Sequence, residues 1–288
     1  MNTHRGYASL GNGRQVHYAE AGTGVPLLLL HSAPRSSRSF RMLLPRLAPD
    51  FRAIAADLPG FGESDPLDGP VTMEALADAM AGFLDARNID RAHVFGYHTG
   101  NKVAAAMAAR HPQRLERLVL CGQIHSIIPD ATARNEAIRD IVDKYFTRFP
   151  ASPHGDEHLR RWLADWSDVT AFALPRSLYA KDVVTAQDIA DLKVRVLDHV
   201  QAVASVEATY GANFTFDFAG ALARITAETL VLELVMPDEE HYGRQLGAVC
   251  ALLANARGAT ILNAGKVALE SHTEEIAGHI TRFLRGRA

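Results

Sequence analysis

The sequence has little of what several classes of protein require. Only two of its 288 residues are cysteine, Cys121 and Cys250, which is too few for a disulfide framework and predicts a reduced, cytoplasmic environment. The longest apolar runs, Val25 to Leu30 and Val103 to Ala109, are far too short to span a bilayer. No apolar segment follows the first residues as a signal peptide would require. We therefore expect no membrane partner.

The sequence also lacks an excess of charge of either sign. The 30 Lys and Arg residues against 33 Asp and Glu residues give a formal net charge of -3, and the basic residues are scattered. Binding to nucleic acid needs a concentrated basic face, so we expect no nucleic-acid partner. The hydrophobic content of 48% is ordinary for a globular protein, and the length suffices for one large domain with a substantial core.

Strand patterns alternate with helix patterns over most of the chain. The chain begins with an expected hairpin, in which Tyr7–Leu10 and Gln15–Glu20 flank a glycine-rich turn. Further strands are predicted at Val25–Leu30, Phe51–Ala56, Ala92–Phe95, Leu118–Cys121, Thr229–Leu234 and Ala259–Leu262. Helical periods are found at Met73–Asn88, Asn101–Arg110 and Glu275–Leu284. This alternation predicts an α/β fold with a mostly parallel sheet of about eight strands flanked by helices.

One long segment interrupts the alternation between the strand at Leu118–Cys121 and the late strands. Its pattern predicts only helices, at Ala131–Phe149, His158–Trp166 and Ala186–Gly211. We therefore expect a core domain of residues 1–123 and 226–288, with residues 124–225 inserted as a helical lid. Aromatic residues of this segment, Trp162 and Trp166 among them, either line a substrate pocket or only pack the lid onto the core.

Four motifs follow predicted strands or close the chain. They read LHSAP at residues 30–34, DLPGFGES at 57–64, GYHTG at 96–100 and AGKVALESH at 264–272. In this order they resemble the oxyanion loop, the D-x-P-G-x-G-x-S loop, the nucleophile elbow and the G-H-x-A-L-E-x-H run of the α/β-hydrolase fold superfamily, in its epoxide-hydrolase and haloalkane-dehalogenase branch. The resemblance covers nearly the whole chain outside the expected lid and implies that fold.

The elbow depends on backbone geometry that this sequence keeps. Gly96 and Gly100 allow the following helix to pack tightly on its strand, and the central residue then projects at the start of the helix. The resemblance implies an oxyanion hole formed by the N–H of Thr99 and the N–H of Ala33.

The side chains depart from the family pattern. His98 stands where the family has Ser, Asp or Cys, and Lys266 stands at the position of the catalytic histidine. The supporting acid is expected after the penultimate strand, where either Asp238 or Glu239 is available. Ser32 and Tyr97, beside the motifs, are expected in the substrate pocket, while Ser32 and Ser271 are not placed as nucleophiles.

The sequence predicts that His98 and Lys266 face each other across the floor of the pocket. A nearby ammonium and the start of a helix both disfavour the imidazolium, so we expect a lowered pKa and a neutral His98. His98 could then act as a base or nucleophile, and Lys266 could stabilise an oxyanion, give a proton or form a Schiff base. Either the protein is an enzyme for a small carbonyl compound, by hydrolysis or by lyase or isomerase chemistry, or it only binds a small ligand.

Cofactors and subunit number complete these expectations. A metal held by His31, His98 and His241 with an acid of residues 238–240 is weighed as an alternative, but no short ligand spacing supports it, and we expect neither a metal nor a cofactor. The expected partner is a small molecule, and the expected oligomeric state is a monomer or a homodimer.

Overall fold

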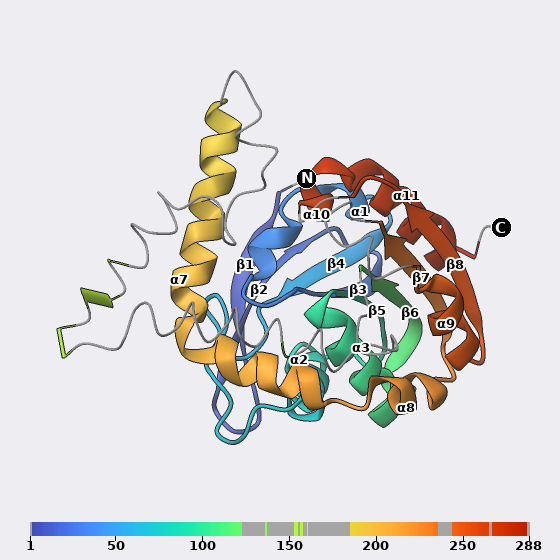
Figure 1. Ribbon diagram of the computed structural model, residues 1–288, viewed down its shortest axis with the longest axis horizontal. Coiled ribbons are helices and arrows are strands. Elements are labelled where there is room, and N and C mark those ends of the chain that lie inside the picture. The colour runs from blue at the N-terminus through green and yellow to red at the C-terminus, as the bar shows by residue number, and fades with distance from the viewer. Residues whose placement is uncertain are drawn as a thin grey trace.

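The fold is seen in a computed structural model that describes residues 2–122, 136, 153–154, 156–157, 160, 185–235, 244–264 and 267–286. Its strands form one eight-stranded sheet with the order β1-β2-β4-β3-β5-β6-β7-β8 (Figure 1). β1 and β2 are antiparallel, β2 is antiparallel to β4, and the remaining pairs are parallel. The strands are β1 (His4–Ser9), β2 (Gln15–Ala21), β3 (Val25–Leu30), β4 (Phe51–Ala56), β5 (Ala92–Tyr97), β6 (Leu115–Cys121), β7 (Glu228–Leu234) and β8 (Ala256–Ile261).

This sheet confirms the architecture predicted from the apolar runs. The bounds of β3 and β4 agree with the sequence patterns at both ends, and Leu27 to Leu30 are completely buried, as a strand covered on both faces requires. β6 begins three residues earlier than predicted because Leu115 is also buried, although Glu116 interrupts the apolar run. The strand register brings Leu30 opposite Gly96, so the loops after β3 and β5 leave the sheet side by side.

Helices cover both faces of the sheet. The helical elements described are η1 (Ser37–Phe40), α1 (Leu44–Leu47), α2 (Met73–Ala86), α3 (Thr99–Arg110), η2 (Pro112–Arg114), α7 (Ala186–Thr215), α8 (Phe218–Ala223), α9 (Leu246–Leu252), α10 (Ala268–Ser271) and α11 (Thr273–Leu284). α1 and α11 pack on one face, and α2, α3 and α8 pack on the other (Figure 1). α11 buries Ile276, Ile280 and Phe283, the spacing that puts three side chains on one helical face. No helix among the described residues is long and apolar enough to cross a membrane.

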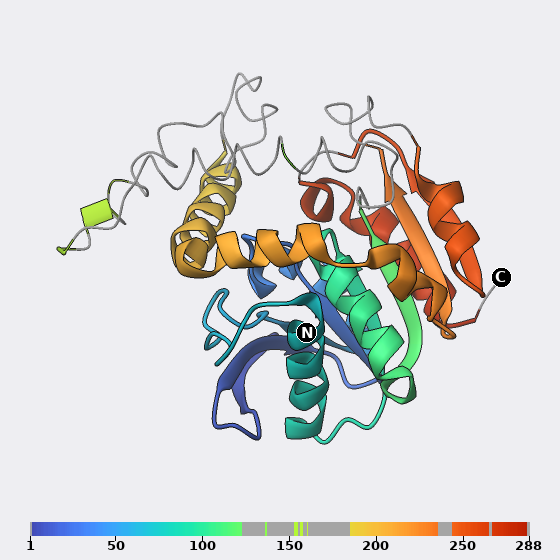
Figure 2. The ribbon, with the colours of Figure 1, turned by 60° about the horizontal axis from the view of Figure 1, so that its bottom comes forward.

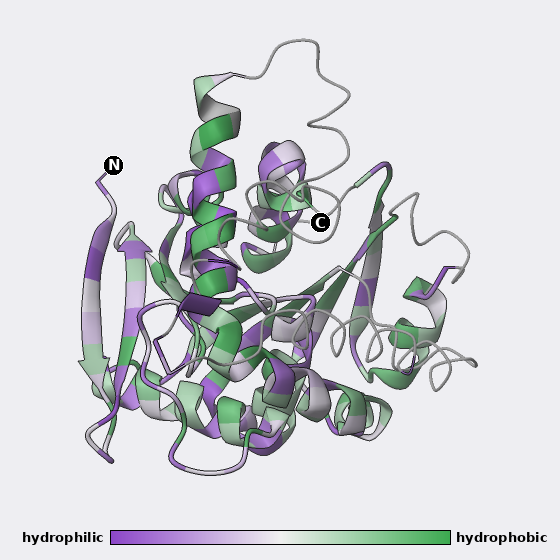
Figure 3. Cartoon of the chain, turned by 60° about the vertical axis from the view of Figure 1, so that its left-hand side comes forward, coloured by the Kyte–Doolittle hydropathy of each residue, from purple (hydrophilic) through white to green (hydrophobic). Residues whose placement is uncertain are grey.

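α7 and α8 occupy the chain between β6 and β7. The helix predicted at Ala186–Gly211 is present as α7 and continues to Thr215, whereas the segments at Ala131–Phe149 and His158–Trp166 lie largely outside the described residues. α7 changes direction part-way along (Figures 1 and 2). Ala202 and Val206 pack into the core, while Leu192 and Val196 form a separate apolar cluster. Both hydrophobic and hydrophilic residues occur along this helix (Figure 3), and the four-residue spacing of Leu192 and Val196 places them on one face, as in an amphipathic helix. The division into a core and a lid stays a prediction.

The close approach of α3 to β3 yields a test of the fold. A Cβ atom at Gly100 would lie 2.2 Å from the carbonyl oxygen of Leu30, and backbone cannot move away as a side chain does. We expect Gly100→Ala to lower the free energy of unfolding by about 3 kcal/mol or more, measured by urea denaturation. Gly278→Ala is the matched control, because α11 leaves open space there, and it should raise stability by about 0.5–1 kcal/mol. Equal effects of the two variants would contradict the packing described.

Candidate active site

The backbone around His98 has the geometry expected of a nucleophile elbow. His98 joins β5 to α3 with φ 49° and ψ -109°, a conformation that non-glycine residues rarely adopt and that costs of order 1–3 kcal/mol. Its N–H donates to Cys121 O at 3.0 Å, and its carbonyl accepts from the N–H of Asn101 at 2.8 Å. A Cβ atom at Gly96 would lie 2.4 Å from the carbonyl oxygen of Gly100, and one at Gly100 would lie 2.2 Å from that of Leu30, which explains why both positions are glycine. The surrounding structure thus holds His98 in a strained turn.

The imidazole of His98, which is half-buried, packs against its neighbours in the sheet. The ring centroids of His98 and Tyr97 lie 4.3 Å apart in an edge-to-face arrangement. Gly122, directly after β6, approaches the same ring so closely that a Cβ atom there would lie 3.0 Å from two of its atoms. An imidazole is much larger than a serine hydroxyl, so Gly122 gives the space that this elbow needs.

The expected oxyanion donors lie on segments that the fold brings together. Thr99 is the first residue of α3, so its N–H has no acceptor within the helix. Ala33 follows β3 and is buried, and the peptide bond between Ala33 and Pro34 is cis. Ser32 is half-buried, and its carbonyl accepts from the N–H of Arg35 at 2.8 Å. The roles of these groups in catalysis stay predictions.

His31 has a structural role in this loop. Its Nε2 accepts from the N–H of Leu58 at 2.9 Å, so Nδ1 carries the proton and donates to Ser32 O at 3.0 Å. Burial lowers the pKa of His31, which is completely buried, and the ring stays neutral. Both nitrogens are therefore occupied, which removes His31 from the metal site weighed above. Among the described residues no group of three His, Cys, Asp or Glu side chains could hold a metal ion.

Asp57 fixes the loop after β4 against the loop after β3. Its carboxylate accepts from the N–H of Ser37 at 2.6 Å, from the N–H of Glu63 at 2.9 Å and from His17 Nδ1 at 2.9 Å. Burial by itself would raise the pKa of Asp57, but these hydrogen bonds outweigh it and lower the pKa to about 2. Asp57 is therefore ionised and holds the loop of β4 against the loop of β3.

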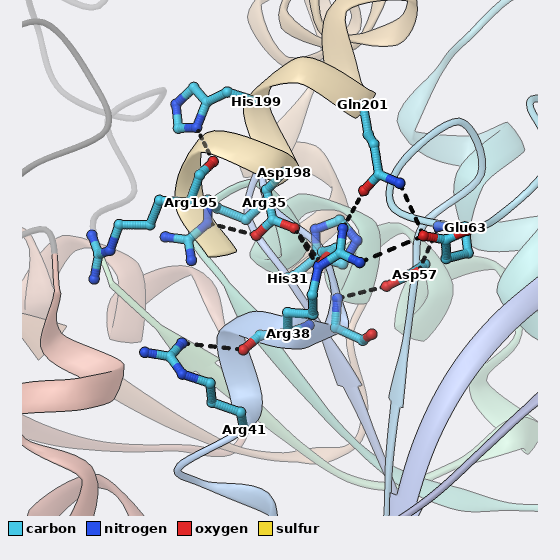
Figure 4. A network of polar contacts seen from close by, with 12 residues as sticks. His31, Arg35, Arg38, Arg41, Asp57, Glu63, Arg195, Asp198, His199 and Gln201 are labelled. Atoms are coloured by element: carbon cyan, nitrogen blue, oxygen red, sulfur yellow. Dashed lines mark hydrogen bonds and ion pairs between the residues drawn. The ribbon is translucent and has the colours of Figure 1, made fainter. Parts of the chain in front are cut away.

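Asp198 on α7 joins the oxyanion loop to the helix above it. Its carboxylate is fully buried and accepts from Ser36 Oγ at 2.7 Å, from Arg35 Nε at 3.0 Å and from Arg38 Nε at 2.8 Å (Figure 4). Arg38 also donates to Gln201, one turn further along α7. These bonds place α7 over the loop that carries Ala33.

A second carboxylate, Glu270 on α10, is shared in the same manner. Arg195 Nη2 of α7 lies 2.9 Å from Glu270 Oε1, and Arg41 Nη1 lies 3.4 Å from the same oxygen. Arg41 also pairs with Asp191 of α7 at 2.5 Å. Sequence reasoning missed this network. The spacing of Arg35, Arg38 and Arg41, three residues apart behind the oxyanion loop, was the available signal.

Within the part of the chain that the structure describes, the buried polar atoms without a hydrogen-bond partner include Arg35 Nη2, Tyr97 Oη and His199 Nε2, all beside this network. His199 Nδ1 donates to Arg195 O at 2.8 Å, so Nε2 carries no proton while the ring is neutral. Burial lowers the pKa of His199 to about 4. Burial, and then the charges of Cys121 and Glu270, raise the pKa of Tyr97, which therefore keeps its proton.

Several expected site residues fall outside the described residues. They are Lys266, Asp238, Glu239, Trp162 and Trp166. The neighbours of Lys266 are described: Ala264 donates its N–H to Val235 O at 3.0 Å, at the carboxyl end of β7, and Val267 precedes α10. Ser271 is exposed on α10 and donates to Val267 O at 3.1 Å. The structure thus brings together His98, Tyr97, Thr99 and the loop of Ala33, and the expected pairing of His98 with Lys266 stays a prediction.

Comparison with known proteins agrees with this geometry. The family model described as "alpha/beta hydrolase fold" matches residues 25–183, more than half of the chain. The chain belongs to the α/β-hydrolase fold family. The solved structure "Epoxide hydrolase CorEH without ligand" superimposes with a TM-score of 0.76 over 100% of both chains at 22% identity, a likeness of fold alone.

Several curated relatives of this α/β-hydrolase fold protein are hydrolases by name. The 2-hydroxymuconate semialdehyde hydrolase of Pseudomonas sp. (strain CF600) is 38% identical over 114 residues, which are 38% of this chain and only 40% of the relative. The 2-hydroxy-6-oxo-6-(2'-aminophenyl)hexa-2,4-dienoic acid hydrolase of Metapseudomonas resinovorans is 25% identical over 96% of this chain and 89% of its own length. The matches with higher identity thus span about two fifths of the relatives, and the chain is related to hydrolases over that part.

Buried neutral histidines give the stability of this α/β-hydrolase fold protein a defined pH dependence. Burial lowers the pKa of His93 and of His199 to about 4, below the unfolded value of about 6.5. The unfolded chain therefore binds more protons in this window, so stability is complete above pH about 6.5 and is lost as the pH falls toward about 4. We expect a slope of up to about 1.4 kcal/mol per pH unit for each histidine, measured by urea denaturation.

His93→Leu removes one of these groups and should flatten that slope, whereas His4→Gln, at an exposed position, should leave it unchanged. Asp57 does not contribute in this window, because its stabilisation is lost only as the pH falls below about 4 toward its folded pKa of about 2. A slope that is the same in the wild type and in His93→Leu would contradict the assignment.

Proposed function

We propose that this protein is a cofactor-free enzyme in which His98 and Lys266 act on a small organic carbonyl compound. The observation that carries the proposal is the strained backbone of His98. Strain of about 1–3 kcal/mol persists only where the surrounding structure enforces it, and here Gly96, Gly100 and Gly122 all serve the elbow. A site that had lost its chemistry would have no need of this arrangement.

The chemistry follows from the residue types. A neutral imidazole at His98 takes a proton from water or from the substrate, or attacks a carbonyl carbon itself. The ammonium of Lys266 and the N–H groups of Thr99 and Ala33 would stabilise the negative charge that develops on the carbonyl oxygen. Asp238 or Glu239 would support Lys266. Ester or lactone hydrolysis and base-driven lyase or isomerase chemistry both fit this set, and the relatives named as hydrolases favour hydrolysis.

A ligand-binding protein without turnover is the second candidate. Replacement of the family residues at both His98 and Lys266 favours it, because the usual hydrogen-bonded pair is gone. The two candidates differ in one measurable respect, which is product formation that depends on His98.

Product analysis after incubation with esters, lactones, epoxides and β-hydroxy ketones tests the proposal. We expect turnover of at least one class, and His98→Ala and Lys266→Met should each lower kcat/KM by about 100-fold or more while circular dichroism stays unchanged. Ser271→Ala, an exposed position on α10, is the control and should retain full activity. Binding of a panel member without any turnover would favour the second candidate.

The nucleophile can be tested separately with a serine-directed fluorophosphonate. Because an imidazole replaces the hydroxyl at the elbow, we expect no stoichiometric labelling of the protein, measured by intact mass spectrometry. The variant His98→Ser with Lys266→His restores the usual residue types and is expected to label without regaining the native reaction. Stoichiometric labelling of Ser32 or Ser271 in the wild type would show that the nucleophile is misplaced.

A further inference from the structure

The glycines around His98 make room for the elbow, but room alone does not hold a strained backbone in one orientation. A φ of 49° at a histidine persists only where other contacts enforce it. Such contacts must reach the two peptide groups that flank His98, because peptide groups are planar and their orientations set φ and ψ. The residues that bond to these two peptide groups are therefore the ones that hold the elbow.

Both flanking peptide groups are hydrogen-bonded, to different segments. The group before His98 is held by its N–H, which donates to Cys121 O at 3.0 Å. The group after it is held by the His98 carbonyl, which accepts from the N–H of Asn101 at 2.8 Å. In a trans peptide the N–H points away from the C=O, so this second bond also sets the direction of the Thr99 N–H, the expected oxyanion donor.

The side chain of Asn101 joins these two segments to each other. Its Nδ2 donates to Cys121 O at 2.9 Å, and its Oδ1 accepts from the N–H of Cys121 at 2.9 Å. His98, Cys121 and Asn101 are thus bonded in a closed cycle, in which a shift of one peptide group strains the bonds of the others. Asn101 is 1% exposed and Cys121 is 0% exposed, so water does not compete for these bonds.

We propose that Asn101 is a positioning residue, which fixes the imidazole of His98 and the N–H of Thr99 by bonding to the backbone of Cys121. Asparagine suits this role because its amide presents a donor and an acceptor side by side, which match the C=O and the N–H of one residue. Its side chain is buried and committed to Cys121, so it acts through His98 and does not contact the substrate. This inference rests on the proposed function for the choice of His98 as the reacting group.

Amide hydrogen exchange, followed by NMR, tests the positioning role without any substrate. Asn101→Ala removes the acceptor of the Cys121 N–H, so faster exchange at Cys121 is expected for a structural role as well. A positioning role also requires the N–H of His98 to exchange at least about tenfold faster and the Thr99 amide resonance to shift. If both signals are unchanged, the proposal is overturned and Asn101 serves only to close the end of β6.

Thr229→Val is the matched control for lost stability. Thr229 is completely buried at the start of β7, and its hydroxyl donates to Ala227 O at 2.9 Å. Removing this buried hydrogen bond should lower the Tm, as Asn101→Ala does, but exchange at His98 should stay within about twofold of the wild type. Equal acceleration at His98 in the two variants would assign the effect to general instability and overturn the proposal.

Asn101→Asp tests the hydrogen bonds themselves and keeps the shape of the side chain, should Asn101→Ala not fold. A protonated carboxyl offers one donor and one acceptor, as the amide does, whereas a carboxylate offers only acceptors and repels Cys121 O. Burial favours the protonated form, so at pH about 5.5 exchange at His98 should lie within about threefold of the wild type at the same pH. Protection of His98 already lost at this pH would overturn the role given to the amide.

Kinetics test the consequence for catalysis with the substrate that the product analysis finds. Asn101→Ala should lower kcat about tenfold or more and change KM by less than about threefold, because a misplaced reacting group loses contacts made in the transition state while binding remains. Unchanged kcat, or a loss confined to KM, would overturn the proposal. The exchange measurements need no turnover, so failure of the proposed function and failure of this inference are distinguishable.

Discussion

The contact between the backbones of Gly100 and Leu30 is the constraint on which the site depends. Because no Cβ atom fits there, α3 starts directly against β3, and the turn that joins β5 to α3 must be strained at His98. The same contact brings the start of α3 next to the loop that carries Ala33. The expected oxyanion donors and the elbow residue are thus positioned by one packing interaction, which side-chain replacement at His98 leaves intact.

The charged network above this contact serves to position α7 more than to stabilise the fold. Buried ion pairs contribute little net stability. Removing Asp198 and its arginines from water costs several kcal/mol for each ion, which their attraction only partly offsets. Apolar residues would join α7 to the core at lower cost, as Ala202 and Val206 do further along the helix. The ion pairs instead fix the orientation of the segments that they join, because guanidinium and carboxylate groups bind each other in few geometries. They therefore fix α7, through Asp198 and Arg195, relative to the loop after β3 and to α10.

The fold was predictable from the sequence because its signals are local and repeat along the chain. The apolar runs of β3 and β4, the glycines of the elbow and the period of α11 each specify structure within a few residues. The partners in the network around Asp198 were not predictable, because the spacing of the arginines shows that they share a side of the chain but not that they meet a carboxylate about 160 positions away. The Tyr97 hydroxyl, which has no hydrogen-bond partner among the described residues, was beyond sequence reasoning for a related reason, since the lack of a partner depends on every neighbouring segment at once.

The replacement at the elbow also had consequences away from it. An imidazole at position 98 needs room that a hydroxyl does not, and Gly122 gives it with φ 101°, a conformation in which glycine is favoured. Gly122 is in turn held by its N–H, which donates to Leu232 O at 3.0 Å and continues the pairing of β6 with β7. The imidazole at the end of β5 is thus accommodated by Gly122 after β6, which β7 holds in place. A serine at position 98 would leave a gap beside Gly122, so the packing at this elbow depends on the imidazole.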